Sequence, residues 1–293
     1  MDTTAGAPYN PVTRAVWYGS LPIQLVLDPA EAARCDLRER ESLLVETPRC
    51  SYLPFLTRQV QRHFAAHGRT QLTGDDFEIW YDYEGTPLKW HYPIGLLYDI
   101  HRLQASAAHG VSEPELPWKI MVHFGNFPSN KLIKSSLTDS CQDYFMSMIK
   151  EADYLRNGST KKVMNMSKAD QMQLWNGLWS KSYDLFWGMN QKLVSNDGAA
   201  TKFLPIRIYL PENCPVIQNP VSPMDEQGQP RTLRQILNIA LPDLFPLGSD
   251  DDHAGASVMI HGIKPSLDVN AVWFAQNMAY PDNFLHLVVI LHP

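Results

Sequence analysis

The sequence predicts an α+β protein in which two small mixed sheets, each packed with a helix, flank a helix-rich middle. Apolar side chains alternate every second residue near Phe77 and near Phe203, which is typical of strands with one buried face. Between residues 137 and 195 the apolar period changes to 3.6, which predicts helices. With 293 residues, 44% of them hydrophobic and 19% charged, the chain is long enough for two or three folding units.

The first region is predicted to open with a hairpin. Residues up to about Pro11 are small and polar and read as a tail. From Trp17, the segment WYGSLPIQLVLDP predicts one strand, a Gly-Ser turn and a second alternating strand. The charged stretch from Glu31 to Glu41 is interpreted as an exposed connection.

A helix and two further strands complete this region. Leu56, Val60 and Phe64 recur every four residues, and Gly68 is placed to end the helix. An alternating strand follows at residues 77–83, a turn at 84–87, and a second apolar run that begins with Trp-His-Tyr-Pro at 90–100. A polar connection at 105–115 then leads to the strand PWKIMVHF at 117–124. The order strand, strand, helix, strand, strand is that of the β-grasp, or ubiquitin-like, fold.

The middle of the chain is predicted to hold two helices. Asp139 and Gln142 resemble a capping box at the start of the first helix. Ser167 and Asp170 stand in the same relation at the start of the second, which is expected to continue to about residue 194. Its apolar stripe is interpreted as core and consists of Met172, Trp175, Trp179, Tyr183, Phe186 and Leu193.

The last region repeats the pattern of the first. FLPIRIYL, from Phe203 to Leu210, predicts a strand, and the Pro-rich VIQNPVSP a hairpin partner or an edge. Thr232 is expected to cap a helix that Pro242 ends, and VMIHGIK and FLHLVVILHP supply further strands. The sequence therefore predicts an N-terminal tail or helix at residues 1–15 and a first ubiquitin-like domain at 16–127. A helix-rich domain is predicted at 134–197 and a second ubiquitin-like domain at 202–293.

Composition favours a cytosolic protein that does not bind nucleic acid. The net charge of -6 and pI near 5.9 give no basic footprint. Four scattered cysteines, Cys35, Cys50, Cys141 and Cys214, form no C-x-x-C pair and are expected to be reduced. The first residues lack the pattern of a secretory signal, and no apolar run is long enough to span a bilayer.

No catalytic residue, cofactor site or metal site is predicted. The common nucleophile, phosphate-loop, dinucleotide and zinc-helix motifs do not occur. His63 and His67, four residues apart, suit a solvated helix face better than a metal pair, and Cys141 suits an inert thiol better than a nucleophile. The run Asp250–Asp252 reads as a solvated turn.

Two other histidines have apolar, strand-like surroundings in the sequence. His91 and His261 are interpreted as hydrogen-bonded structural side chains and not as catalytic bases.

Lys150 is expected to be exposed. At about 100° per residue, Phe145, Met148, Ile149, Ala152 and Leu155 share one face of the first middle helix. Lys150 falls about 140° from Phe145, on the polar face with Asp143 and Tyr154. By itself this describes an ordinary surface lysine.

Six stretches in this order resemble the autophagy-related protein 5 family across nearly the whole chain: SYLPF, IWYDYEGTPLKWHYPIGLLYD, PWKIMVHF, FMSMIKEAD, VMIHGI and YPDNFLHLVVI. The resemblance implies two ubiquitin-like domains around a helix-rich domain. It also implies an acceptor lysine in the motif Met148–Asp153, which makes Lys150 the residue joined by an isopeptide bond to the C-terminal glycine of autophagy-related protein 12. Glu151 or Asp153 is a hypothetical aid to its deprotonation.

The resemblance further implies the partners. Autophagy-related proteins 7 and 10 would carry out the conjugation. The conjugate, with the coiled-coil autophagy-related protein 16, would act with protein 3 as an E3-like scaffold. It would promote transfer of protein 8 to phosphatidylethanolamine on the preautophagosomal membrane, where the chain is expected to be peripheral. The chain itself would carry no thioester and act through proximity and orientation.

Two other hypotheses remain open at this point. One is a ubiquitin-like adaptor that is never conjugated and binds partners through its surfaces. The other is a small-molecule hydrolase that uses Cys141 or the pair His63 and His67. The first does not need Lys150, and the second needs a pocket that gathers a base or metal ligands.

Overall fold

The computed structural model describes residues 10–34, 42–67, 79–109, 116–134, 139–195, 201–211, 214–248 and 255–292. The chain forms two compact units, and each is described by itself. One unit comprises residues 18–145. The other comprises residues 1–17 together with 146–293. Four features predicted from the sequence lie outside the described residues or side chains. They are the Asp139 side chain at the start of the first middle helix, the helix end at Gly68, most of the charged stretch after Arg34 and the acidic run Asp250–Asp252.

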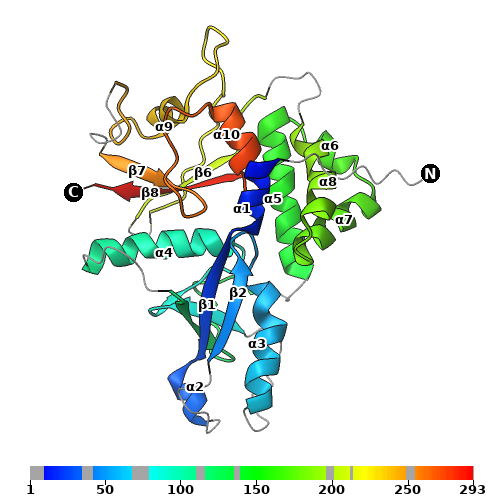
Figure 1. Cartoon of the computed structure of the whole chain (residues 1–293), viewed down its shortest axis with the longest axis vertical. Coiled ribbons are helices and arrows are strands. Elements are labelled where there is room, and N and C mark those ends of the chain that lie inside the picture. The colour runs from blue at the N-terminus through cyan, green and yellow to red at the C-terminus, as the bar shows by residue number, and fades with distance from the viewer. Residues whose placement is uncertain are drawn as a thin grey trace. The chain divides into compact units, whose positions relative to one another are not determined.

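The unit of residues 18–145 contains a five-stranded mixed sheet in the order β2-β1-β5-β3-β4. The central strands β1 and β5 run parallel, while β2 pairs antiparallel with β1 and β3 pairs antiparallel with β5. Figure 1 shows β1 beside β2. The strands are β1 Ser20–Leu27, β2 Leu43–Pro48, β3 Trp80–Tyr83, β4 Thr86–Pro87 and β5 Trp118–His123. The helices are α2 Pro29–Arg34, α3 Pro54–His67 and α4 Ile94–His109.

One face of this sheet and helix α3 form a core, as predicted. Leu56, Val60 and Phe64 are buried, and they pack with Ile23 of β1 and Ile120 of β5. Alternate residues of β1 and β5 point inward because successive side chains of a strand face opposite sides. The β-grasp arrangement inferred from the sequence is therefore present.

The predicted opening hairpin is wrong. Trp17 lies in the last turn of a helix, α1 Pro11–Tyr18. The strand that pairs antiparallel with β1 is β2. The helix starts where Asn10 Oδ1 accepts from Val12 N at 3.0 Å and Pro11 takes the first helical position. Trp17 is buried against Phe186, with ring centroids 4.8 Å apart. The apolar residues near Trp17 suggested a strand, but Trp17 is buried against α8, which lies far along the chain.

The apolar run after Trp90 also forms a helix, α4, which was not assigned from the sequence. Arg49, buried at the end of β2, donates to Asp99 of α4 and to the carbonyl oxygen of Gly95 at 3.2 Å. A Cβ on Gly95 would lie 2.7 Å from the Arg49 Cβ, so only glycine permits this approach. The pair fixes α4 to the edge of the sheet.

The middle of the chain forms a helical bundle. Its helices are α5 Asp139–Asn157, α6 Lys161–Met164, α7 Lys168–Trp179 and α8 Tyr183–Val194. The capping box of Ser167 and Asp170 is confirmed. The single helix predicted from Ser167 is two helices, because the chain turns at Lys181 with φ 59°. Gly177 lets the two helices meet, since a Cβ there would lie 2.5 Å from the Phe186 nitrogen.

The second sheet has three strands in the order β6-β8-β7, with β6 parallel to β8 (Figure 1). The elements are β6 Ile206–Tyr209, α9 Leu233–Ala240, β7 Ala256–Met259, α10 Ala271–Met278 and β8 Leu285–Leu291. Thr232 and Gln235 form a capping box, and α9 ends before Pro242, as predicted. Ile217 and Val221 make isolated bridges at the edge of the sheet. Helix α10, capped by Asn270, was not predicted.

Candidate functional site

Lys150 lies on the exposed face of α5, as predicted. Phe145, Met148, Ile149 and Ala152 are buried on the other face of this helix. No hydrogen bond or ion pair within the described part of the chain involves Lys150. The buried face therefore fixes the backbone of α5 at Lys150, while the amine of this side chain stays accessible to a reagent.

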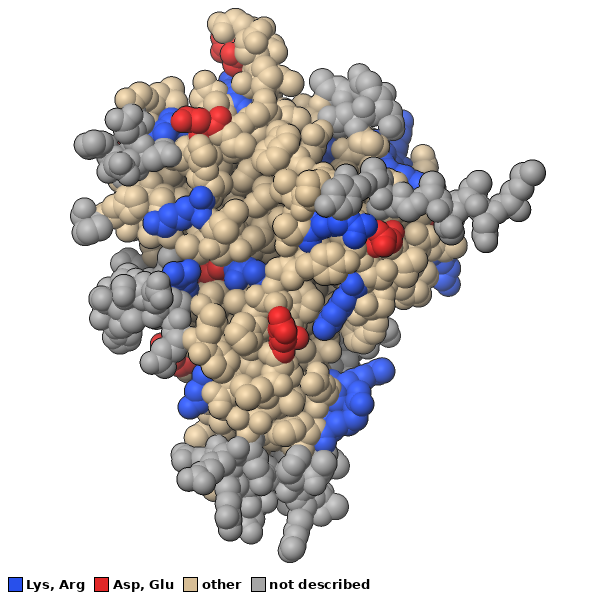
Figure 2. Space-filling view, in the orientation of Figure 1, with Lys and Arg blue, Asp and Glu red and all other residues tan. Residues whose placement is uncertain are grey.

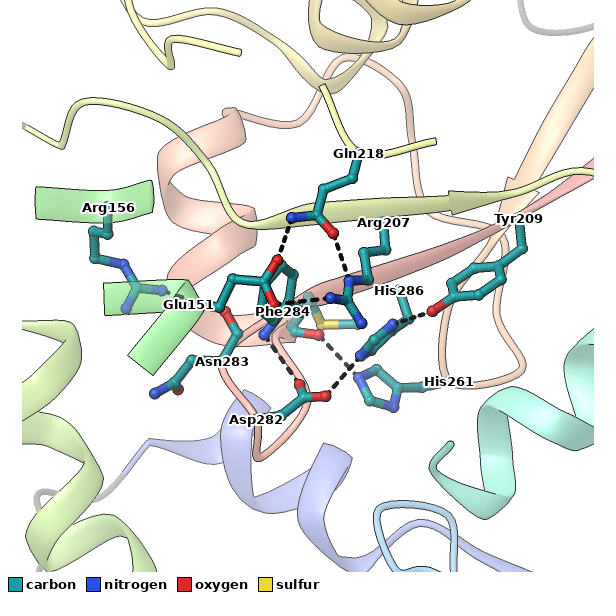
Figure 3. A network of polar contacts seen from close by, with 11 residues as sticks. Glu151, Arg156, Arg207, Tyr209, Gln218, His261, Asp282, Asn283, Phe284 and His286 are labelled. Carbon is teal, nitrogen blue, oxygen red and sulfur yellow. Dashed lines mark hydrogen bonds and ion pairs between the residues drawn. The ribbon is translucent and has the colours of Figure 1, made fainter. Parts of the chain in front are cut away.

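The next residue anchors α5 to the second sheet. Glu151 accepts from Arg207 Nη2 at 3.0 Å and from Gln218 Nε2 at 2.5 Å, and Arg207 Nε donates to Gln218 Oε1 at 2.7 Å (Figure 3). The Arg207 guanidinium also lies over the Phe284 ring, 4.7 Å from its centroid. These four side chains form a closed network. They hold α5 one residue away from Lys150.

Asp153 has a structural role. Its buried carboxylate accepts from Asn157 Nδ2 at 2.6 Å and from the Val163 backbone N–H at 3.2 Å. Both Asp153 and Glu151 are thus engaged with groups other than the Lys150 amine. These contacts do not favour either carboxylate as the base that deprotonates Lys150, since a general base must lie within hydrogen-bond reach of the proton it takes.

The last turn of α5 is also fixed. Arg156 is buried, and burial lowers its pKa to about 10, an effect opposed by the charge of Asp153. The carbonyl oxygens of Arg156 and Leu155 accept from the backbone N–H groups of Lys202 and Phe203 at 2.8 and 3.2 Å. These bonds satisfy carbonyls that a helix end leaves unpaired. Lys150 therefore lies on a helix that is fixed on both sides of it.

A second buried network joins α8 to the segment before β8. Asn190 and Asn283 exchange two side-chain hydrogen bonds of 3.0 and 2.9 Å. His286 is hydrogen-bonded to Asp282 at 2.9 Å and to the Tyr209 hydroxyl at 2.8 Å (Figure 3). All of these side chains are buried, so the network holds the second unit together and offers no exposed nucleophile.

Among the side chains that the structure describes, the other candidates from the sequence do not gather into a reactive site. His63 packs against the Phe64 ring, and the His67 side chain lies outside the described residues. His91 packs against Tyr144, and His261 is hydrogen-bonded to the Met278 carbonyl at 2.9 Å. Neither of the last two lies in a strand.

A pocket of about 220 Å³ lies among α6, α7 and α8. Its lining contains neither cysteine nor histidine and consists of Lys162, Asn165, Met166, Asp170, Met189, Lys192 and Leu193. The hydrolase hypothesis required a pocket that brings Cys141 or the pair His63 and His67 together with a base or metal ligands. The pocket among α6, α7 and α8 contains none of these three residues, so it does not support the hydrolase hypothesis.

Cys141 is expected to be unreactive. Its side chain is buried, and burial raises the pKa of the thiol to about 12. At pH 8 it remains protonated, because deprotonation begins only as the pH approaches that value. Iodoacetamide should modify the exposed Cys214 on the order of 100-fold faster than Cys141 in the folded protein, as followed by peptide mass spectrometry. In urea the two rates should converge, and equal rates before unfolding would contradict this assignment.

Family models match three consecutive stretches of the chain. The autophagy protein ATG5 UblA domain matches residues 16–124, the alpha-helical bundle region matches 138–196, and the UblB domain matches 203–289. The chain belongs to the autophagy protein 5 family. Its fold is accordingly two ubiquitin-like domains on either side of a helical bundle region.

Relatives and a solved structure agree with the family. Autophagy protein 5 of Phaeosphaeria nodorum is 32% identical over 94% of this chain and 95% of its own length. Autophagy protein 5 of Drosophila melanogaster is 31% identical over 95% of this chain and 96% of its own length. The crystal structure of Kluyveromyces marxianus Atg5 superposes with a TM-score of 0.75 at 25% identity, covering 94% of this chain and 98% of its own.

None of the helices among the described residues is long and apolar enough to cross a membrane.

Proposed function

We propose that this chain is the acceptor of a ubiquitin-like modifier, autophagy-related protein 12, and that Lys150 is the attachment site. The supporting observation is an exposed lysine, within the family's Met-x-Lys-Glu-Ala-Asp motif, on a helix anchored at Glu151 and Asp153. A lysine whose backbone is fixed on a packed helix can be presented reproducibly to a reagent that another protein delivers.

The proposed reaction is an acyl transfer. The unprotonated Lys150 nitrogen attacks the thioester carbonyl of the modifier's C-terminal glycine, which autophagy-related protein 10 carries after activation by protein 7. A carbon–nitrogen bond forms, the carbon–sulfur bond breaks, the thiolate leaves and the nitrogen loses a proton. Because both nearby carboxylates accept hydrogen bonds from other groups, the proton acceptor is assigned to the conjugating enzyme or to water.

The conjugate is proposed to act without a catalytic residue of its own. With autophagy-related protein 16 it would form an E3-like scaffold that positions protein 3, which transfers protein 8 to phosphatidylethanolamine. This assignment rests on membership of the autophagy protein 5 family. The scaffold is proposed to be cytoplasmic and peripheral on the preautophagosomal membrane.

The visible surface suits contacts with proteins better than contacts with nucleic acid. On the face shown in Figure 2, lysine and arginine side chains of the described residues stand apart on a largely uncharged surface. Phosphate backbones are bound by continuous basic stripes or patches. The net charge of -6 points the same way.

The experiment that tests this function is a reconstitution with mapping of the product. The activating enzyme, the conjugating enzyme and the modifier are combined with the full chain, and the slower-migrating product is digested. Mass spectrometry should find the modifier's C-terminal residues on the Lys150 side chain. A product branched at another lysine would overturn the site, and no covalent product would favour the adaptor that is never conjugated.

A further inference from the structure

Three side chains that could hold a metal ion meet at one end of the first sheet. Asp28 directly follows β1, and His123 is the last residue of β5. Leu27 pairs with Val122 in the parallel register, and the Asp28 backbone N–H donates to the Val122 carbonyl at 2.9 Å. The carboxyl ends of these two central strands therefore lie side by side, which brings Asp28 next to His123 although they are far apart in the sequence.

Helix α2 adds a third ligand. Asp28 Oδ1 accepts from the backbone N–H groups of Ala30 and Glu31 at 3.0 and 3.1 Å and so caps this helix. Glu31 is only 7% exposed, and its Oε2 accepts from Phe124 N at 2.8 Å. One ligand atom each from Asp28, Glu31 and His123 lies within 4.8 Å of the other two.

The His123 ring is oriented by residues of β3. Trp80 stacks on the ring with centroids 3.8 Å apart and planes 8° from parallel. Asp82 is hydrogen-bonded to His123 Nε2, and it also accepts from Gly85 N at 2.8 Å. When a neutral imidazole donates through Nε2, its lone pair is on Nδ1. That nitrogen lies 3.9 Å from Asp28 Oδ2.

The charges of the side chains around His123 favour a bound cation. Within the described residues, no lysine or arginine forms an ion pair with Asp28, Glu31 or Asp82, and His123 is the basic side chain that contacts Asp28 and Asp82. A buried carboxylate with no cationic partner is costly. The separation of 3.9 Å is too long for a hydrogen bond between Asp28 and His123. It suits two ligands that are each about 2.1 Å from one shared ion.

We propose that Asp28, Glu31 and His123 bind a zinc ion, with water as the fourth ligand. One imidazole nitrogen and two carboxylates form a donor set that zinc accepts, whereas calcium and magnesium favour oxygen alone. Asp82 would then accept a hydrogen bond from His123 and so orient the ring of this metal-bound histidine. The ion ties α2 to the ends of β1 and β5 and stabilises the first ubiquitin-like domain.

The test uses the full chain, freed of metal with a chelator and titrated with zinc chloride by calorimetry. The informative variants are Asp28→Asn and Glu31→Gln, which remove charge but keep an oxygen acceptor for the backbone N–H groups. Asp225→Asn is the matched control, because Asp225 accepts from Gln227 N and Gln229 N in a turn elsewhere. Cys214→Ser controls for the exposed thiol.

We expect one zinc ion per chain and a melting temperature that rises with zinc concentration. Affinity should fall at least about tenfold in Asp28→Asn and in Glu31→Gln and stay unchanged in both controls. Cobalt in place of zinc should give the visible absorption of a tetrahedral site in the wild type and in both controls, and should give it weakly or not at all in Asp28→Asn and Glu31→Gln. Failure of the wild type to bind zinc below about 100 µM would overturn the proposal. Equal binding by wild type and both site variants would also overturn it.

Discussion

Replacing Lys150 by arginine should abolish formation of the conjugate. Arginine keeps the positive charge and the length of the side chain, but its delocalised guanidinium does not form the isopeptide bond. Because Lys150 is exposed, the exchange should leave the fold unchanged. In the reconstituted reaction we expect the slower-migrating product to fall at least about 100-fold, below detection on a gel, and lipidation of autophagy-related protein 8 to fall with it.

A second lysine provides the control for this variant. Lys168 is exposed at the start of α7, and Lys168→Arg makes the same chemical change on another helix of the bundle. It should conjugate at the wild-type rate, and both variants should melt at the wild-type temperature. Conjugation of Lys150→Arg at the rate of Lys168→Arg would remove Lys150 as the acceptor.

Replacing Asp99 by alanine should have the largest effect on stability. Asp99 is 0% exposed and Arg49 is 7% exposed, so the substitution removes a carboxylate that pairs with a buried guanidinium. Loss of one partner of a buried pair costs about 3–5 kcal/mol. We expect α4 and the end of β2 to exchange their amide hydrogens faster by about two to three orders of magnitude, as measured by native-state hydrogen exchange.

The double variant Arg49→Met with Asp99→Leu separates the charge effect from packing. Replacing both partners by apolar side chains of similar size is often neutral, so most of the lost stability should return. The part that does not return reports the hydrogen bond from Arg49 to the Gly95 carbonyl, about 1 kcal/mol. A double variant as unstable as Asp99→Ala would show that shape, and not charge, makes this pair important.

Local patterns in the sequence predicted much of the fold. The spacing of Leu56, Val60 and Phe64 gave α3, and the cap at Thr232 gave the start of α9, because both signals act within a few residues. The exposure of Lys150 followed from the same helical period.

The errors arise where partners distant in the sequence decide the structure. Trp17 was assigned to a strand because its burial depends on Tyr183 and Phe186, which no local pattern shows. The break between α7 and α8 falls at Lys181, without the glycine or proline that usually marks a turn. Helix α10 is short and largely apolar, a composition that periodicity does not separate from a buried strand.

The contacts of the candidate sites were likewise beyond the sequence. The partners of Glu151 lie 56 and 67 residues away along the chain. Asp28 and His123 meet only because β1 and β5 become neighbours in the sheet. Side chains from separate strands are brought together by topology, so spacing along the chain does not reveal such a group.

The place of α1 has a consequence for the order of folding. The Thr13 and Tyr183 hydroxyls are hydrogen-bonded across 170 residues, and the whole of residues 18–145 forms a separate unit inserted between them. Closing so long a loop is entropically costly, and contacts of high sequence separation form slowly. Docking of α1 is therefore expected late, after the inserted unit has formed. Until then the apolar side of Trp17 remains available to chaperones during synthesis.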